Sequence, residues 1–124
     1  MAPKASPVFT DSISMGRKEN TTVGYYSYAM GLAATASEAF SHAEGNGATA
    51  TGMAAHAEGQ STISSGTGSH SEGSASTASA FASHAEGYQT VASNDLAHAE
   101  GNQSVASGYC SHAEGYNTVA SMTT

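Results

Sequence analysis

Short stretches in which small and polar side chains alternate recur along this chain every fourteen residues. Six of them read His, small residue, Glu, Gly, and together they hold every histidine of the chain. The paired positions are His42 and Glu44, His56 and Glu58, His70 and Glu72, His84 and Glu86, His98 and Glu100, and His112 and Glu114. A fixed motif at a fixed period indicates a repeat architecture.

Each fourteen-residue unit predicts two short strands and two turns. The first strand is the Ser–His–Ala–Glu stretch, such as 111–114, closed by a glycine suited to a turn with positive φ. The second strand, such as 90–93 or 104–107, contains the β-branched residues that favour strands. We therefore predict an all-β domain of about eight coils over residues 12–124, preceded by a flexible lead-in over residues 1–11, which contain both prolines.

Side chains alternate between the two faces of a strand, which predicts what lies inside each coil. The residue between His and Glu belongs to a series of small side chains, and the second strand supplies a matching series. The first series is Ala29, Ala43, Ala57, Ser71, Ala85, Ala99 and Ala113, and the second is Ala36, Ala50, Ser64, Ala78, Ala92, Ala106 and Ala120. These two series predict a narrow core, with His and Glu pointing outward.

Two earlier units carry apolar residues in the same outward slots. Ile13 and Tyr28 stand in the histidine slot, and Met15 and Met30 stand in the glutamate slot. Stacked carboxylates would repel one another unless they were neutralised, and a histidine of an adjacent chain could donate a hydrogen bond to each glutamate. A face that is apolar at one end and unvarying elsewhere favours a buried seam between chains.

Composition supports association between chains. Val, Ile, Leu, Met and Phe number only 17 of 124 residues, too few for an ordinary globular core. A net charge of −7 with only three basic residues disfavours nucleic acid as a partner. No apolar run approaches the roughly 20 residues that span a bilayer, so we expect no membrane contact from this segment. Cys110, the single cysteine, is assigned no role.

The S-x-A-x-G unit is followed three residues later by Ser or Thr and then x-Ala-x-Gly, with a period of fourteen. Over about residues 12–121 this pattern resembles the head repeats of YadA-like trimeric autotransporter adhesins, and similar S-H-A-E-G arrays occur in phage tail or neck fibres. The resemblance implies a left-handed parallel β-roll (β-solenoid) assembled as a parallel homotrimer. It places the residues that flank the central alanine at the three-fold axis: Ile13, Met15, Tyr28, Met30 and the six His/Glu pairs. His and Glu replace the usual apolar pair of that family, which favours a polar axis.

The function expected on this basis is a structural or adhesive fibre head on a bacterial cell surface or a virion appendage, outside the cell. Host-surface proteins or glycans would contact variable outward residues, for which the candidates are Phe40, Met53, Phe81, Tyr88, Tyr109 and Tyr116. These side chains can equally pack on neighbouring coils. The alternative function is a passive spacer of a phage tail appendage without its own ligand.

Other classes are less favoured by the residues. Six identical His-x-Glu pairs give no unique cleft and no consistently placed nucleophile, so we expect no enzyme and no cofactor. A metal is not required, because hydrogen bonds between chains would explain the same slots, although capture of Zn²⁺, Ni²⁺ or Cu²⁺, or of an anion, stays open. A solvated ladder of His and Glu also stays open. An ice-binding β-solenoid is less favoured, because the outward positions of the second strand mix Thr, Ile and Val.

Overall fold

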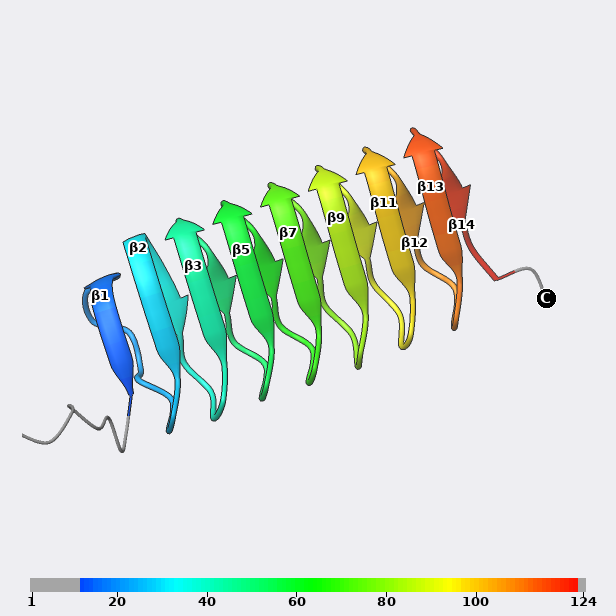
Figure 1. Ribbon diagram of the computed structural model, residues 1–124. Coiled ribbons are helices and arrows are strands. Elements are labelled where there is room, and N and C mark those ends of the chain that lie inside the picture. Colours follow the sequence, from blue (N-terminus) through cyan, green and yellow to red (C-terminus); the bar gives the residue numbers. More distant parts are fainter. Residues whose placement is uncertain (1–11, 123–124) are drawn as a thin grey trace, which may run out of the picture.

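The computed structural model describes residues 12–122 and shows a parallel β-solenoid of about eight turns, with no helix among them. The polypeptide winds in flattened coils that stack along one axis (Figure 1). The coil spacing of about fourteen residues and the parallel β-roll agree with the prediction. The predicted lead-in, residues 1–11, lies outside the described residues.

Two strand series form the two faces of the roll. The first face contains β1 (Ile13–Arg17), the start of β2 (Tyr28–Ala36), β3 (His42–Asn46), β5 (His56–Gln60), β7 (His70–Ser74), β9 (His84–Tyr88), β11 (His98–Asn102) and β13 (His112–Tyr116). The second face contains the end of β2, then β4 (Thr49–Ala50), β6 (Ile63–Ser64), β8 (Thr77–Ala78), β10 (Val91–Ala92), β12 (Val105–Ala106) and β14 (Val119–Ala120). Because β2 runs through both faces, it joins them into one sheet.

All strand pairs are parallel and in register with the repeat. His98 pairs with His84 and His112, and the alanines and glutamates pair in the same way. At the other end, Ile13 pairs with Tyr28, and Tyr28 pairs with His42. The two apolar units therefore do occupy the same slots as the His/Glu units. A register shift between Met15 and Arg17 interrupts the regular pairing of β1 with β2.

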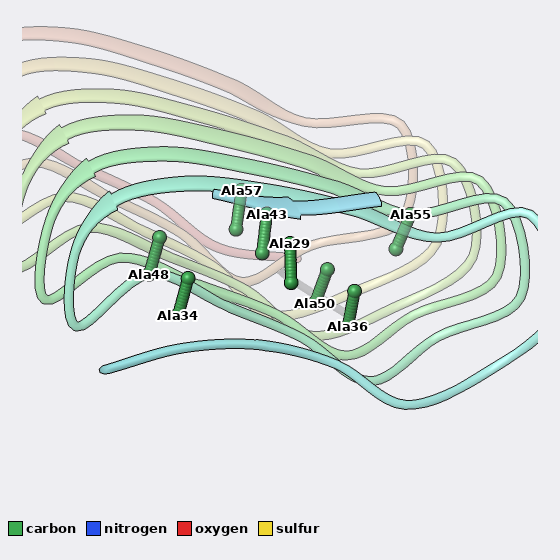
Figure 2. Packing of buried hydrophobic residues seen from close by; sticks show 8 residues of the cluster. All are labelled: Ala29, Ala34, Ala36, Ala43, Ala48, Ala50, Ala55 and Ala57. Carbon is green, nitrogen blue, oxygen red and sulfur yellow. The ribbon is translucent and has the colours of Figure 1, made fainter. Parts of the chain in front are cut away.

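The core is built from alanine, serine and threonine. Alanines from both faces point toward one another inside the coil (Figure 2). Both predicted series are buried, apart from Ala120 in the terminal coil, which is only partly covered. Two further buried series lie where the chain turns between faces, and the sequence analysis did not single them out: Ser27, Ser41, Ala55, Ser69, Ser83 and Ala97, and Ala34, Ala48, Thr62, Ser76, Thr90 and Ser104.

Several hydroxyl groups in this interior find partners within the roll, whereas the buried Ser69 Oγ has none. Ser64 donates a hydrogen bond to the carbonyl of His56 at 2.6 Å, and its Oγ lies 2.7 Å from that of Ser71. Thr90 and Ser76 are joined across adjacent coils at 2.9 Å. A buried hydroxyl is costly without such a partner, so these contacts explain how a polar side chain replaces alanine in the core.

The sequence suggested that the glycine after each glutamate ends the first strand, but the structure shows that it does not. The strand continues through Gly87 to Tyr88, and the glycine lies inside it with φ +113°. An added Cβ at Gly87 would lie 2.1 Å from the carbonyl oxygen of Gly101 in the next coil. Glycine is required here by both its φ and this close approach of two backbones. The turn comes two residues later, where Gln89 has φ 54°.

Candidate functional site

The six His/Glu pairs form one straight array on the first face, which we call the His–Glu ladder. Its members are His42, Glu44, His56, Glu58, His70, Glu72, His84, Glu86, His98, Glu100, His112 and Glu114. Each histidine begins a strand and each glutamate stands two residues later, so both point away from the buried residue between them. The predicted outward orientation is therefore confirmed.

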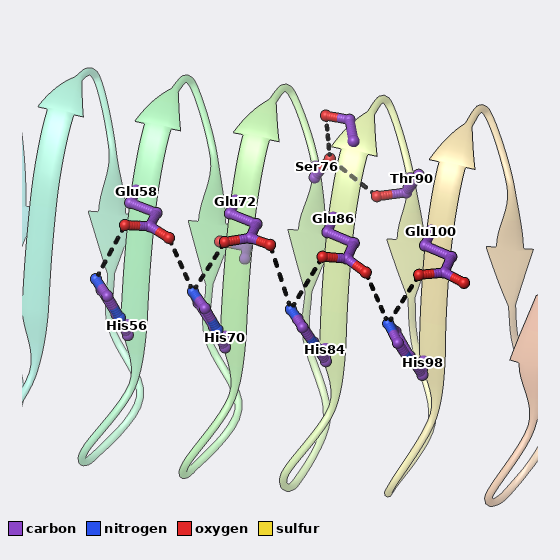
Figure 3. Close-up of polar contacts among 12 residues, drawn as sticks. His56, Glu58, His70, Glu72, Ser76, His84, Glu86, Thr90, His98 and Glu100 are labelled. Carbon is purple, nitrogen blue, oxygen red and sulfur yellow. Dashed lines mark hydrogen bonds and ion pairs between the residues drawn. The ribbon is translucent and has the colours of Figure 1, made fainter. Parts of the chain in front are cut away.

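Imidazoles and carboxylates alternate in a zigzag that crosses from coil to coil (Figure 3). Each Nε2 from His56 to His98 lies near one glutamate of its own coil and one of the preceding coil. For His98, Glu86 Oε1 lies at 3.3 Å and Glu100 Oε2 at 3.8 Å. The histidine side chains of these inner coils are about one third exposed, for example 34% at His70. All of these pairs lie within one chain, and one face of the ladder remains open.

The histidine rings also stack on one another. Centroids of successive rings are 4.3 to 4.8 Å apart, and the rings are nearly parallel, with interplanar angles of 1° to 13°. Tyr28 meets His42 edge-on at 4.5 Å, and its hydroxyl lies 3.0 Å from Met30 Sδ. The apolar units and the His–Glu ladder thus form one continuous column of side chains.

Protonation in the ladder is linked between neighbours. A hydrogen bond shared with the carboxyl of Glu86 raises the pKa of Glu72 to about 7, and the same contact lowers the pKa of Glu86 to about 2. Burial lowers the pKa of His84, and the adjacent rings of His70 and His98 lower it further. The pKa of His42 is lowered by burial and by His56. One proton shared by two carboxyls therefore relieves their repulsion.

An open groove of about 1330 Å³ runs along the glutamate side of the ladder. Met30 lines one end, and the six ladder glutamates with the glycines that follow them line the rest. Met15, which continues the glutamate slot at the end of the column, is 62% exposed. The sequence-predicted axial residues therefore lie together on one face.

The predicted ligand-facing residues are all exposed, but they do not share one surface. Phe40, Met53, Phe81 and Tyr109 lie in the turns that precede the first strand of a coil, whereas Tyr88 and Tyr116 end β9 and β13 at the opposite edge. The first group belongs to a longer apolar edge that also contains Tyr25, Tyr26 and Leu96. Counting in steps of fourteen would have found these three in the sequence.

Packing between coils accounts for part of this edge. The rings of Tyr26 and Phe40 stack with centroids 5.7 Å apart, yet Phe40 remains 59% exposed. Phe40 therefore meets both expectations for these aromatic residues: its ring packs on a neighbouring coil, and part of it faces solvent.

The ladder offers ligand sets for cations. Three-residue groups with one ligand atom each, all within 4.8 Å, are found among its histidines and glutamates. Within residues 12–122 the structure contains no helix long and apolar enough to cross a membrane. Searches against protein-family models and curated proteins found no match for this chain.

Proposed function

We propose that this chain is a structural module of an extracellular fibre, on a cell surface or a virion appendage, that assembles as a parallel, left-handed homotrimer. The His–Glu ladder and its apolar extension would form the seam. Rigid, multivalent display or host attachment would be its role, as in the YadA-like adhesin heads whose repeats it resembles.

The observation that carries this proposal is a contrast between two kinds of constant residue. The fold itself accounts for the buried small residues, which fill the coil, and for the glycine slot, where two backbones meet. It does not account for His and Glu, which point outward along an open groove. Side chains that stay constant on an outer face are expected to contact a binding partner. The groove repeats in every coil, so the partner is expected to follow the same repeat.

Two features support a second copy of the chain as the contact. The ladder face is straight and carries no bulky variable side chain, and Met30 and Met15 extend it as an apolar surface. Closed symmetric assemblies are the usual form of a homo-oligomer. Three parallel copies would present every outer residue three times, which multiplies weak contacts.

Molar mass in solution tests the proposal. Light scattering should give three times the chain mass of 12.4 kDa. Glu86→Lys, which puts a cation into the proposed seam, should dissociate the assembly, whereas Ser93→Lys on an exposed position of the second face should not. A folded monomer of the unaltered chain, at micromolar concentration, would refute the proposed seam.

Attachment through the apolar edge is a second candidate, favoured by the exposure of Phe40, Phe81 and Tyr109 along one side. A screen of the assembled protein against matrix proteins and cell-wall glycans tests it. Binding that is lost in Phe81→Ser and Tyr109→Ser, with molar mass unchanged, would assign attachment to this edge. No binding in the screen would favour the passive spacer.

A further inference from the structure

The contacts inside the His–Glu ladder are too long to be ordinary hydrogen bonds. The Nε2 atoms lie 3.3 to 4.0 Å from the carboxylate oxygens, whereas an N–H···O bond is typically about 2.7 to 3.2 Å. Among the six histidines, only His98 and His112 make a long hydrogen bond to a ladder glutamate, at 3.3 Å each. The Nε2 atoms of His42, His56, His70 and His84 are buried and have no hydrogen-bond partner. A buried nitrogen without a partner is costly and indicates a missing one.

These separations match two ligands of one metal ion. Donor atoms at about 2.0 Å from a tetrahedral ion are about 3.3 Å apart, a few tenths of an ångström less than most of the distances in the ladder. Each inner Nε2 has a carboxylate oxygen on either side, in its own coil and in the preceding one (Figure 3). A small contraction around an ion would satisfy the ring nitrogen and both carboxylates together.

Charge favours the same conclusion. Six stacked imidazolium ions at ring spacings of 4.3 to 4.8 Å would repel one another, and a metal ion binds the neutral form of the ring. With neutral rings, the six glutamates have no basic residue of the ladder to balance them.

We propose that the His–Glu ladder is a linear array of binding sites for divalent ions of the Zn²⁺ class. Three groups share no residue: His42, Glu44 and His56; Glu72, His84 and Glu86; and His98, Glu100 and His112. Three divalent ions would balance the charge of six carboxylates. Each group supplies three protein ligands, which leaves a fourth position for water. Nitrogen donors favour Zn²⁺, Ni²⁺ or Cu²⁺ over Ca²⁺ and Mg²⁺.

The three ligands of each site come from one chain, so this inference does not depend on the proposed trimer. An occupied array would tie adjacent coils together, because each group spans two adjacent coils. Metal binding is thus expected to raise the thermal stability of the roll as well as to neutralise its face.

Equilibrium dialysis of the untagged, EDTA-treated protein against Zn²⁺, with the metal counted by mass spectrometry, tests the inference. We expect about three Zn²⁺ per chain and a higher melting temperature, with Mg²⁺ and Ca²⁺ at equal concentration giving neither. The double variant His98→Gln with His112→Gln should bind one ion fewer. Glu38→Gln, an exposed carboxylate outside the ladder, should bind as the unaltered chain does.

A second readout needs no variant. In the unaltered protein, Zn²⁺ should shift the ring-proton NMR signals of the ladder histidines, and Co²⁺ should give the visible bands of a four-coordinate site. Fewer than one Zn²⁺ per chain, or unmoved ring signals, would overturn the inference. Equal binding of Ca²⁺ would do so too. Light scattering in the same buffers separates the proposals: a monomer that binds Zn²⁺ refutes the trimer alone, and a trimer without Zn²⁺ refutes the metal array alone.

Discussion

Replacing Gly87 by alanine should open the stack between two coils. The alanine would have to adopt φ near +113°, and its Cβ would lie 2.1 Å from the carbonyl oxygen of Gly101. An unstrained carbon–oxygen approach is about 3.3 Å or more, so β9 and β11 would have to separate by roughly 1 Å. That displacement involves backbone rather than a flexible side chain, and the ladder of hydrogen bonds between the two strands cannot follow it intact.

The loss of stability has two contributions, the positive φ imposed on alanine and the hydrogen bonds lost between the two strands. Holding alanine in the left-handed region costs about 1 to 3 kcal/mol, and the loss of two strand hydrogen bonds costs about 1 kcal/mol each. The sum, roughly 3 to 5 kcal/mol, is a large part of the stability of a domain of this size. We expect the midpoint of thermal unfolding to fall by roughly 10 to 20 °C.

Two matched variants separate the terms. Gly68 has φ +65° but no atom within 4 Å of an added Cβ, and Ala54 and Ala82 fill the same slot in neighbouring coils. Gly68→Ala should therefore cost less than about 1 kcal/mol. Gly115 has φ +118° in the terminal coil, where the nearest atom to an added Cβ is Thr118 Cγ2, at 3.3 Å. Gly115→Ala should therefore show only the cost of holding alanine at a positive φ.

Thermal unfolding followed by circular dichroism, at one protein concentration and with the molar mass checked, measures all three. Hydrogen exchange shows which coils are destabilised, because repeat proteins can lose the contact between two units without unfolding elsewhere. If Gly87→Ala unfolds within about 1 kcal/mol of Gly68→Ala, the close approach of the two backbones does not limit the fold, and our explanation for the constant glycine is wrong.

Three further perturbations address the N-terminal end, the core and the ladder. Arg17 donates hydrogen bonds to the carbonyls of Thr22 and Ala36, both at 2.7 Å. Arg17→Met should therefore lower the free energy of unfolding by about 1.5 to 3 kcal/mol and increase hydrogen exchange in β1 and β2 first. Unchanged exchange in these two strands would contradict this. Ser71→Ala should change stability by less than about 0.5 kcal/mol, because Ser64 keeps its bond to the carbonyl of His56 and alanine fills this slot elsewhere; a loss above 1 kcal/mol would show that the Ser64–Ser71 contact matters. The pKa of Glu72, about 7, is above that of the unfolded chain, so the stability it contributes is complete below about pH 4.5 and is lost as pH rises through 7. In EDTA, the stability of Glu72→Gln relative to the unaltered chain should therefore increase as pH rises from 5 to 8, and Glu38→Gln is the control. A stability difference that does not depend on pH would show that Glu72 shares no proton.

Much of the coil could be derived from the sequence because side-chain direction alternates along a strand. A period of fourteen with one small residue between His and Glu is sufficient to place Ala43 and Ala50 inside and His42 and Glu44 outside. The equivalence of Ile13 and Tyr28 with the histidine slot came from the shape of the motif, since fifteen residues separate these two, and the strand pairing bears it out. The left-handed winding of the roll and the trimer were expected only from a resemblance, and they remain proposals.

The turns were harder to place. The constant glycine suggested the end of a strand, but left-handed turn residues of this roll include Gln89, Phe40 and Leu96, which carry no such signal in sequence. Stacking explains this, because the hydrogen bonds of adjacent coils hold each turn in a conformation that an isolated segment would not favour. The glycine is constant for a different reason, the approach of the neighbouring backbone.

The sequence by itself determined the repeat, the inner and outer faces and the pairing of like residues, since all three follow from the period and from the alternation of side chains along a strand. Tertiary structure alone decided how the coils meet. It brought each Nε2 from His56 to His98 between carboxylates of two coils, and it left four histidine nitrogens of the ladder without a hydrogen-bond partner. Those distances depend on the spacing of stacked backbones and on the reach of each side chain across it, which no pattern along a single strand contains.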